Sequence, residues 1–396
     1  MANKENTSDE GLRVSYDVKT YHEQKYIDYT LRLREILKTL PSFAKDYFRA
    51  IEPTTSANTR ISYAYDIRVF FRFLMENNPV YKNYTIDQFT LADIENLEPV
   101  DIEEYQEYLK VYKNDEKQVT NTEKGLARKM SALRSFYGYY FKQTADIDMS
   151  GIVWEPIGYC GEFYFAGKYY FKRQAISKNP TLLVDMPKLH EKAIIRLDAD
   201  EVVRLLDYVD HGGDHLTGQK KAYFEKTRNR DLAILTLLLG TGIRVSECVG
   251  LDINDVDFEN NGIKVMRKGG NEMIVYFGEE VENALKTYMY TTRRTTLPLP
   301  GHENALFLST QRKRMGVQAI ENMVKKYARE VTPNKKITPH KLRSTYGTSL
   351  YKETGDIYLV ADVLGHKDVN TTKKHYAAID EDRRRQAANI VKLREV

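Results

Sequence analysis

The feature that most constrains the fold is a series of segments in the first part of the chain that repeat apolar side chains every three or four positions. This spacing places the apolar side chains on one face of a helix, and that face has to be buried against other helices. Pro41 and Pro79 end the first two segments, because proline cannot continue a helix. The segments are residues 26–40, 59–79, 101–113 and 122–143. This part of the chain is therefore predicted to be a compact all-helical domain of roughly four or five helices.

The second half of the chain combines helices with one small sheet. A capping box at Asp198 and Glu201 predicts the start of its first helix, and residues 231–240 are expected to form an apolar helix. Strands joined by the turn sequences ENNG and GGN predict a small antiparallel sheet. These strands are residues 255–258, 262–268 and 272–277. Further helices are expected over residues 281–294, 317–331 and 340–353, before a tail from about Glu381.

Composition and punctuation divide the chain into three parts. Residues 1–40 are predicted to be an N-terminal extension, residues 41–187 a helical domain, and residues 188–396 a second domain that ends in a C-terminal tail. An insertion is suspected at about residues 144–171, because this stretch holds the only tryptophan and near-copies of one phrase, YYFKQ and YYFKRQ, flank it. Insertions at the surface are tolerated at helix ends. The proline-punctuated residues 175–190 are predicted to be an interdomain linker.

The composition is that of a globular protein with a weakly basic surface. The 396 residues suffice for two domains with separate cores, and 42% hydrophobic and 29% charged residues are ordinary proportions. A net charge of +4 is a modest hint of a nucleic-acid partner, although the basic residues gather in local clusters. No secretory signal is visible and the longest apolar run is too short to span a bilayer, so a cytoplasmic location is expected.

Two features that could suggest a metal or thiol site are better explained as structural. His211 and His215 invite a metal interpretation, but without further ligands nearby a polar loop is predicted. Cys160 and Cys248 lie far apart, and Cys248 is predicted to be a small core residue. No metal and no cofactor are therefore expected.

The strongest chemical signal is a series of basic and histidine residues that ends in a tyrosine near the C-terminus. Cations that converge on a phenol are what attack on a phosphodiester requires, because the phosphate oxygens are already negative and gain charge in the transition state. Arginine suits this role, since its planar fork donates two parallel hydrogen bonds and keeps its charge. The candidate catalytic residues are Arg244, Lys268, His340, Arg343, His366 and Tyr376.

The type and position of these residues suggest separate roles. His340 and Arg343 are three positions apart on a predicted helix and therefore share a face. Lys268, at the tip of a predicted hairpin, could protonate the leaving 5′ oxygen. Tyr376 would be the nucleophile, since neighbouring cations favour the phenolate. Each residue alone is more often structural, so the case rests on their order and types together.

Further charged residues are candidates for supporting roles. Glu247 lies one helical turn beyond Arg244 and could orient one of the cations. The predicted helix of residues 122–143 is basic on one side and could follow a DNA backbone, although a solvated face explains this pattern about as well. The DNA-binding candidates are Lys124, Arg128, Lys129, Arg134 and Lys341.

The motifs GTGIRVSE, RKGGNE, TPHKLRST and LGHKDVNTT, followed by Tyr376, resemble those of the tyrosine recombinases, the family of phage integrases and Xer proteins. The resemblance covers about residues 190–385 and is greatest to the single-recombinase Xer proteins of Gram-positive bacteria. It implies a mainly α fold, in which a helical SAM-like core-binding domain precedes a mixed α/β catalytic domain with a small antiparallel sheet. It also implies that the candidate catalytic residues form one active site, with Tyr376 as the nucleophile and no metal or ATP.

The resemblance further implies a site-specific recombinase that acts through a 3′-phosphotyrosine and a Holliday junction, in integration and excision or in chromosome dimer resolution. The implied partners are double-stranded DNA recombination sites, copies of the same chain in a homotetramer on two sites, and accessory DNA-bending or excision factors. Ser344 stands where many relatives carry a second histidine. Two alternatives stay open: a type IB topoisomerase, which shares the phosphotyrosine chemistry, and a non-catalytic DNA-binding regulator with the same fold.

Overall fold

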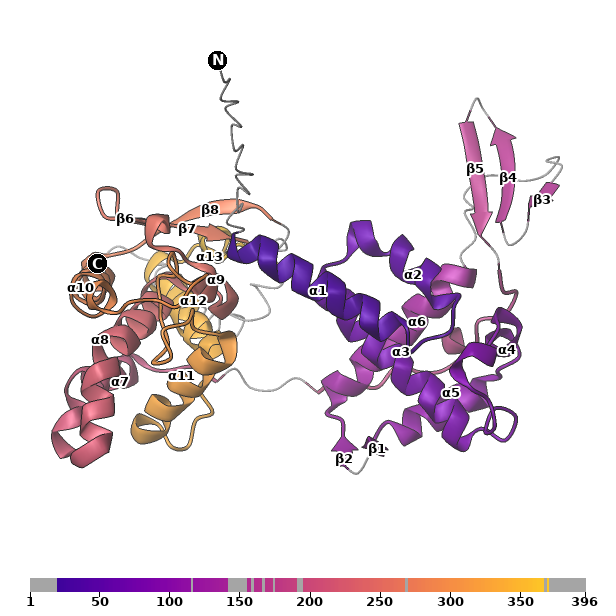
Figure 1. The fold of residues 1–396 in the computed structure, drawn as a ribbon, viewed down its shortest axis with the longest axis horizontal. Helices are drawn as coiled ribbons and strands as arrows, with labels where there is room; N and C mark the ends of the chain where they lie inside the picture. Colours follow the sequence, from indigo (N-terminus) through magenta and orange to yellow (C-terminus); the bar gives the residue numbers. More distant parts are fainter. Residues whose placement is uncertain are drawn as a thin grey trace, which may run out of the picture. The chain divides into compact units, whose positions relative to one another are not determined.

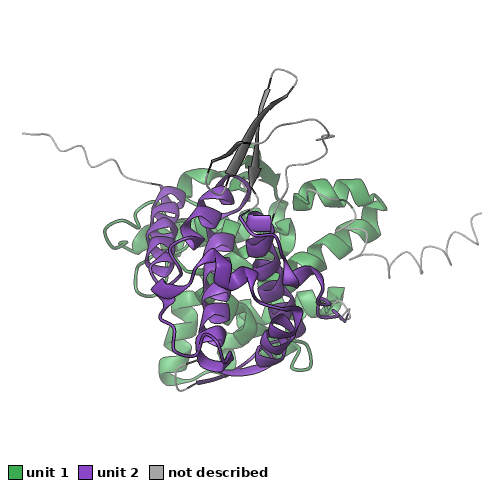
Figure 2. Ribbon diagram, turned by 90° about the vertical axis from the view of Figure 1, so that its right-hand side faces the viewer, with its two compact units in different colours: residues 1–18, 193–396 green, residues 19–192 purple. Residues whose placement is uncertain are grey.

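The chain folds into two units, residues 19–192 and residues 193–396, here called the N-terminal and the C-terminal unit (Figure 2). The computed structural model describes residues 20–114, 117–141, 155–157, 160–165, 168–173, 175–190, 195–267, 270–366 and 369. Among these residues, no helix is both long enough and apolar enough to cross a membrane.

The N-terminal unit is mainly helical, as the apolar spacing predicts. Its helices are α1 (Tyr21–Leu37), α2 (Ala44–Ala50), α3 (Ala57–Asn77), α4 (Leu91–Glu95), α5 (Pro99–Tyr108) and α6 (Glu123–Phe141) (Figure 1). Thr20 and Glu23 form a capping box at the start of α1, and the hydroxyl of Ser56 caps α3. Helix α1 packs against α3, so a helix of this unit lies within the stretch predicted as an N-terminal extension.

Aromatic side chains fill the core of this unit. Tyr47, Phe71 and Phe136 are fully buried, and the rings of Tyr47 and Phe136 meet edge to face with centroids 5.2 Å apart. The buried phenols find acceptors: the hydroxyl of Tyr137 donates to the carbonyl of Ile94 at 2.9 Å. The buried tyrosines of this unit, such as Tyr47 and Tyr137, are therefore packing residues.

A two-stranded hairpin follows α5, where the sequence predicts helix as far as residue 113. Strands β1 (Val111–Asn114) and β2 (Lys117–Thr120) pair antiparallel, so the helix prediction is wrong beyond Tyr108. Ile102, Tyr105 and Leu109 are buried at helical spacing, and Tyr112 continues that spacing. Tyr112 is also buried, but it reaches the core from a strand and stacks on Tyr108 with ring centroids 5.2 Å apart.

Three further strands lie within and beside the suspected insertion of residues 144–171. They are β3 (Glu155–Ile157), β4 (Cys160–Phe165) and β5 (Lys168–Arg173), which pair antiparallel in the order β3-β4-β5. The chain then packs on the N-terminal unit, where Ile176 and Val184 are buried and Pro180–Leu182 forms a 3-10 turn. The first residues of the predicted linker are thus part of this unit.

The C-terminal unit is built around α8, whose apolar run from Ala233 to Leu238 is buried between α7, α10 and α12. The capping box of Asp198 and Glu201 begins α7, as predicted. Cys248 is also buried, which confirms its prediction as a core residue. The helices are α7 (Ala199–His211), α8 (Gly218–Thr241), α9 (Val245–Gly250), α10 (Glu279–Thr287), α11 (Val317–Val331), α12 (Pro339–Thr354) and α13 (Ile357–Leu364), and a π-helical turn over Tyr288–Arg293 extends α10.

The predicted antiparallel sheet of this unit is confirmed. Strands β6 (Val256–Asp257), β7 (Gly262–Met266) and β8 (Glu272–Tyr276) follow one another in the order β6-β7-β8. Ile263 and Val265 alternate with the exposed Lys264, so that one face of β7 is buried. Strand β7 also contacts α9, which brings the β7–β8 hairpin to the segment that carries Arg244.

Candidate active site

Arg244 is positioned by a tight turn between α8 and α9. Gly242 ends α8 in the left-handed region, with φ of +63°, and a Cβ atom there would lie 2.4 Å from the ring of Tyr346. Only glycine fits this turn, because both the backbone angle and the close approach exclude a side chain. Arg244 is therefore fixed as the N-cap residue of α9.

Glu247 is the buried anion of the site. Its carboxylate accepts the backbone N–H of Arg244 at 2.8 Å and the Nη1 of the same arginine at 2.8 Å. Arg267 donates to it as well, from Nη1 at 3.3 Å. The Glu247 side chain is only 3% exposed, and a buried carboxylate is tolerated because cations and hydrogen bonds compensate for its lost hydration.

Arg343 joins three segments of the C-terminal unit. It lies on α12 and is buried, and its Nη1 donates to the carbonyl of Gly242 at 2.6 Å. Its Nη2 donates to the carbonyl of Leu364 at the end of α13. The turn that positions Arg244 and the last residue of α13 are thus held by one guanidinium.

Arg267 is a third arginine of this network and is not among the catalytic residues predicted from the sequence. It follows β7, and its side chain is 9% exposed. Burial lowers the pKa of Arg267 and the Glu247 carboxylate opposes this change, but an arginine stays charged at neutral pH in any case. Its position directly before Lys268 in RKGGNE was the one available signal.

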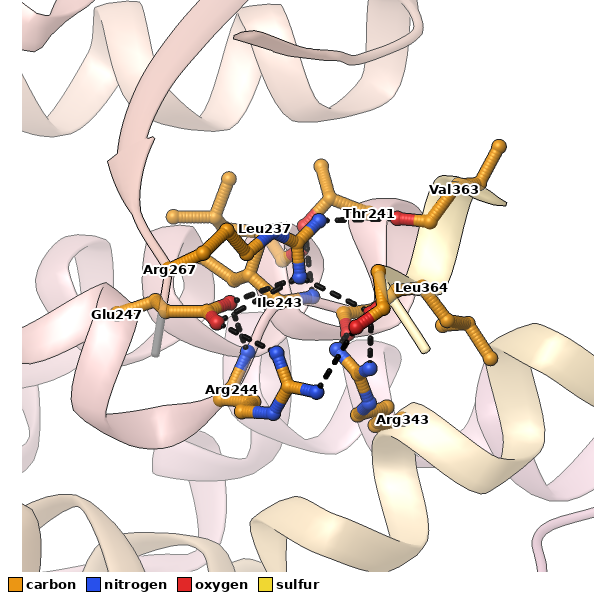
Figure 3. A network of polar contacts seen from close by, with 11 residues as sticks. Leu237, Thr241, Ile243, Arg244, Glu247, Arg267, Arg343, Val363 and Leu364 are labelled. Carbon is orange, nitrogen blue, oxygen red and sulfur yellow. Dashed lines mark hydrogen bonds and ion pairs between the residues drawn. The ribbon is translucent and has the colours of Figure 1, made fainter. Parts of the chain in front are cut away.

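Together the three guanidinium groups surround the C-terminal end of α13 (Figure 3). Arg267 donates to the carbonyls of Val363 and Leu364, each at 3.0 Å, and Arg244 donates to the carbonyl of Gly365 at 3.3 Å. The last carbonyls of a helix lack partners within the helix and carry partial negative charge. The site is therefore a cluster of cations around Glu247 and a helix end.

Gly365 permits this arrangement, and its replacement gives a testable result. It has φ of +61°, and a Cβ atom would lie 3.0 Å from Cζ of Arg267. We expect Gly365→Ala to lower the free energy of unfolding by about 1–2 kcal/mol. The substitution should also slow the expected phosphodiester cleavage, because it displaces Arg267. Denaturant unfolding and a single-turnover rate measure the two effects.

Gly218 supplies the matched control for that substitution. Its φ is +58°, and nothing lies within 4 Å of the position of its Cβ. Gly218→Ala should lose similar stability through backbone strain but keep the reaction rate. Equal rates for both variants would show that the contact between Gly365 and Arg267 has no part in the reaction.

The other predicted catalytic residues are described only in part. His340 is exposed on α12, one turn before Arg343. The backbone N–H of His366 donates to the carbonyl of Ala361 at 2.9 Å, directly after the end of α13. Lys268 and Tyr376 lie outside the described residues. No group of at least three His, Cys, Asp or Glu side chains in the described part of the chain could hold a metal ion.

The candidate DNA-binding residues of α6 do not share one surface. Lys124 is exposed, whereas Lys129 is buried and donates to Asp66 at 2.9 Å. Arg134 donates to the carbonyls of Thr181 and Val184, at 3.1 and 2.5 Å. Lys129 and Arg134 are thus engaged within the N-terminal unit and do not offer their charge to a phosphate as folded. Lys341 lies partly exposed on α12 of the other unit.

Arg128 does lie at a basic pocket, together with residues of α3. The pocket has a volume of about 170 Å³ and is lined by Tyr65, Asp66, Arg68, Val69, Arg72, Tyr112, Arg128 and Lys129. Asp66 lies buried and is bonded to both Arg128 and Lys129. Burial raises its pKa, and the two cations offset part of this rise. Four cationic side chains and one carboxylate therefore line this pocket.

Comparison with known proteins decides the family. Residues 195–383 match the phage integrase family, and residues 44–144 match its N-terminal SAM-like domain. Tyrosine recombinase XerC of Caldanaerobacter subterraneus subsp. tengcongensis is 30% identical over 366 residues, which cover 91% of this chain and 89% of that protein. The chain belongs to the phage integrase family of tyrosine recombinases. Tyrosine recombinase XerS of Streptococcus mutans serotype c is also 30% identical to this recombinase, over 89% of its chain and 96% of the relative.

Solved structures share the fold of the recombinase. The Tn1549 transposon integrase in complex with transposon right end DNA matches with a TM-score of 0.54 at 20% identity, over 87% of this chain and 98% of that one. XerH bound to a palindromic difH substrate matches with a TM-score of 0.53 at 18% identity, over 84% of this chain and 79% of that one. The predicted fold class and the predicted enzyme class, a site-specific tyrosine recombinase, are confirmed.

Proposed function

We propose that Tyr376 of the recombinase attacks a phosphodiester, leaving a 3′-phosphotyrosine and a free 5′ hydroxyl. The 5′ hydroxyl of a second site then attacks this phosphotyrosine and rejoins the strands, and two such exchanges pass through a Holliday junction. The phosphotyrosine retains the energy of the broken bond, so this cycle requires no ATP. The observation that carries the proposal is the cluster of guanidinium groups around Glu247, which presents fixed positive charge at the C-terminal end of α13, whose cap residue Gly365 stands eleven residues before Tyr376 in the sequence.

Arg244 is the arginine of the cluster best placed to receive a phosphate. Its side chain is 35% exposed, and two of its five N–H donors bond to Glu247 and Gly365. Its remaining donors can stabilise the negative charge that grows on the phosphate oxygens during attack. Arg343 is buried, and we propose that it holds the turn of Gly242 and the end of α13 in addition to any contact with the phosphate.

The remaining catalytic roles follow from residue chemistry. We assign Lys268 the protonation of the leaving 5′ oxygen, because an ammonium group is a competent general acid. His340, on the same helix as Arg343, and His366, after α13, would donate hydrogen bonds to the phosphate. Cations beside the phenol of Tyr376 would favour its phenolate form.

The proposed partner is double-stranded DNA that carries a recombination site. The structures with the same fold are complexes with transposon end DNA and with a difH substrate, and by analogy we infer that this recombinase binds comparable sites. Exchange between two sites requires cleavage of four strands, which favours a homotetramer. Action on chromosomal or mobile DNA supports a location in the cytoplasm, and DNA-bending or excision factors would be accessory partners.

The basic pocket of the N-terminal unit supports DNA binding at a defined place. Arg68, Arg72 and Arg128 line a cavity of about 170 Å³ where α3 and α6 pack together, and the guanidinium of Arg68 also lies over the ring of Tyr65 at 4.9 Å. The carboxylate of Asp66 accepts a hydrogen bond from Arg128 and so orients its guanidinium. We propose that this pocket binds a phosphate of the DNA backbone, since its four cationic side chains carry more positive charge than the carboxylate of Asp66 neutralises.

We expect Arg68→Ala to weaken binding to every DNA sequence alike. Loss of one phosphate contact should also reduce the slope of log K against log salt by about one. Titrations of labelled duplex at several salt concentrations measure this slope. Arg49, which is exposed on α2 beside Asp46, gives the control: if Arg49→Ala changes the slope equally, the pocket is not a specific phosphate contact.

A covalent trapping assay tests the proposed function. A duplex site with a nick beside the scissile phosphate loses a short fragment on cleavage, so that the protein–DNA adduct accumulates and can be seen on a denaturing gel. The native chain should form this adduct. No adduct on any nicked site would favour the non-catalytic regulator, and efficient relaxation of a plasmid without a site would favour the topoisomerase.

A further inference from the structure

The backbone of Arg267 closes the loop that carries Lys268. The N–H of Arg267 donates to the carbonyl of Asn271 at 2.8 Å, and its carbonyl accepts the N–H of Gly270 at 3.1 Å. These two bonds form the last rung of the β7–β8 hairpin and the turn beyond it. Lys268 is the next residue in the chain after Arg267.

The side chain of Arg267 bonds to the C-terminal end of α13 and to Glu247. Its two Nη atoms donate to the carbonyls of Val363 and Leu364, each at 3.0 Å, and Nη1 also contacts the carboxylate of Glu247. Gly365 lies against the guanidinium, because it has no side chain to keep it away. Arg267 thus joins the β7–β8 hairpin to the buried carboxylate of Glu247 and to the C-terminal end of α13.

These contacts favour a structural role for Arg267 over a direct contact with DNA. A planar guanidinium can bond two adjacent carbonyls and a carboxylate at once, whereas a lysine ammonium is a point charge on a flexible stem. Arg267 is 9% exposed at its side chain, in contrast to 35% for Arg244. Arg244 can therefore reach a phosphate, while Arg267 is enclosed by protein.

We propose that Arg267 is a positioning residue that ties the closing turn of the β7–β8 hairpin to the end of α13, and thereby places Lys268 for protonation of the leaving oxygen. The proposal rests on the proposed function. In that step the phenolate oxygen of Tyr376, whose proton has passed to water, forms a bond to phosphorus. The bond from phosphorus to the 5′ oxygen breaks, and its electron pair stays on that oxygen, which takes a proton from the Lys268 ammonium.

A substrate with sulfur in place of the 5′ bridging oxygen tests this role. A thiolate is a far better leaving group than an alkoxide and needs no proton, so cleavage of this phosphorothiolate does not depend on a general acid. We expect Arg267→Ala to slow single-turnover cleavage of the ordinary site by about 100-fold. On the phosphorothiolate site the same variant should stay within about threefold of the native rate. Lys268→Ala should show the same pattern.

Two further variants keep the result interpretable. Arg244→Ala should be slow on both substrates, because charge on the phosphate oxygens develops with either leaving group. Arg267→Lys, which retains the charge and one donor group, should recover part of the rate on the ordinary site. Its thermal unfolding and that of Arg267→Ala show whether each variant is folded.

The contrary outcomes are distinct. If a folded Arg267→Ala variant is equally slow on both substrates, Arg267 acts through Glu247 and Arg244, and the proposal is wrong. If its rate on the ordinary site equals the native rate, Arg267 has no positioning role. If the native chain cleaves neither substrate, or Tyr376→Phe forms an adduct, the proposed function itself fails.

Discussion

Tyr376→Phe is expected to abolish the covalent adduct with nicked DNA, with a rate at least about 10⁴-fold below that of the native chain. The substitution removes the single oxygen that would bond to phosphorus and keeps the aromatic ring, so folding and DNA binding should be retained. A denaturing gel detects the adduct, and a gel-shift titration detects binding. Recombination between two sites should be lost to the same extent.

Tyr358 supplies the control for that experiment. It lies at the start of α13, and its side chain is 71% exposed, so it is another accessible tyrosine of the same region. Tyr358→Phe should form the adduct at the native rate. An adduct that persists in Tyr376→Phe and disappears in Tyr358→Phe would show that Tyr358, and not Tyr376, is the nucleophile.

Arg244→Ala is expected to lower the rate of strand cleavage by about 10²–10³-fold, which is the typical cost of removing one fixed donor from a charged transition state. DNA affinity should change little, because many phosphate contacts share it. The fold should also be kept: the backbone N–H of residue 244 still reaches Glu247, and Arg267 still compensates its charge.

Two comparisons separate catalysis from structure in this experiment. Arg204, exposed on α7 with one bond to the carbonyl of Asp200, provides a control in Arg204→Ala, which should be active. Arg343→Ala should instead lose stability, by about 3–5 kcal/mol, because two buried carbonyls would lose a charged donor. A parallel fall of binding and cleavage in Arg244→Ala would contradict a catalytic role for Arg244.

The candidate site shows how far sequence patterns reach. The spacing of GTGIRVSE and TPHKLRST led to Arg244, Glu247 and Arg343, and the structure brings all three into one network. Arg267 was not predicted because its role depends on hydrogen bonds to the carbonyls of residues 363 and 364, about a hundred residues further along the chain. A backbone acceptor leaves no trace in the sequence.

The basic helix α6 shows the opposite error. Lys124 and Arg128 are four positions apart and share a face, but at about 100° per residue Lys129 is turned by roughly 140° from Lys124 in one direction and Arg134 by roughly 80° in the other. The spacing alone thus argued against a single basic face. The structure assigns Lys129 to Asp66 and Arg134 to the segment that follows β5.

The sequence by itself determined the elements and the chemistry of this recombinase: the helices, through apolar spacing, caps and prolines, and the reaction, through residue types whose order is specific to one family. Both depend on short stretches of chain, where local sterics and functional groups decide. The tertiary structure alone decided that Tyr112 enters the core from a strand, that Arg267 joins a hairpin to a helix end, and that α3 and α6 enclose a basic pocket. These features arise from packing and from hydrogen bonds between distant segments, and the energies of such contacts exist only once the chain has folded.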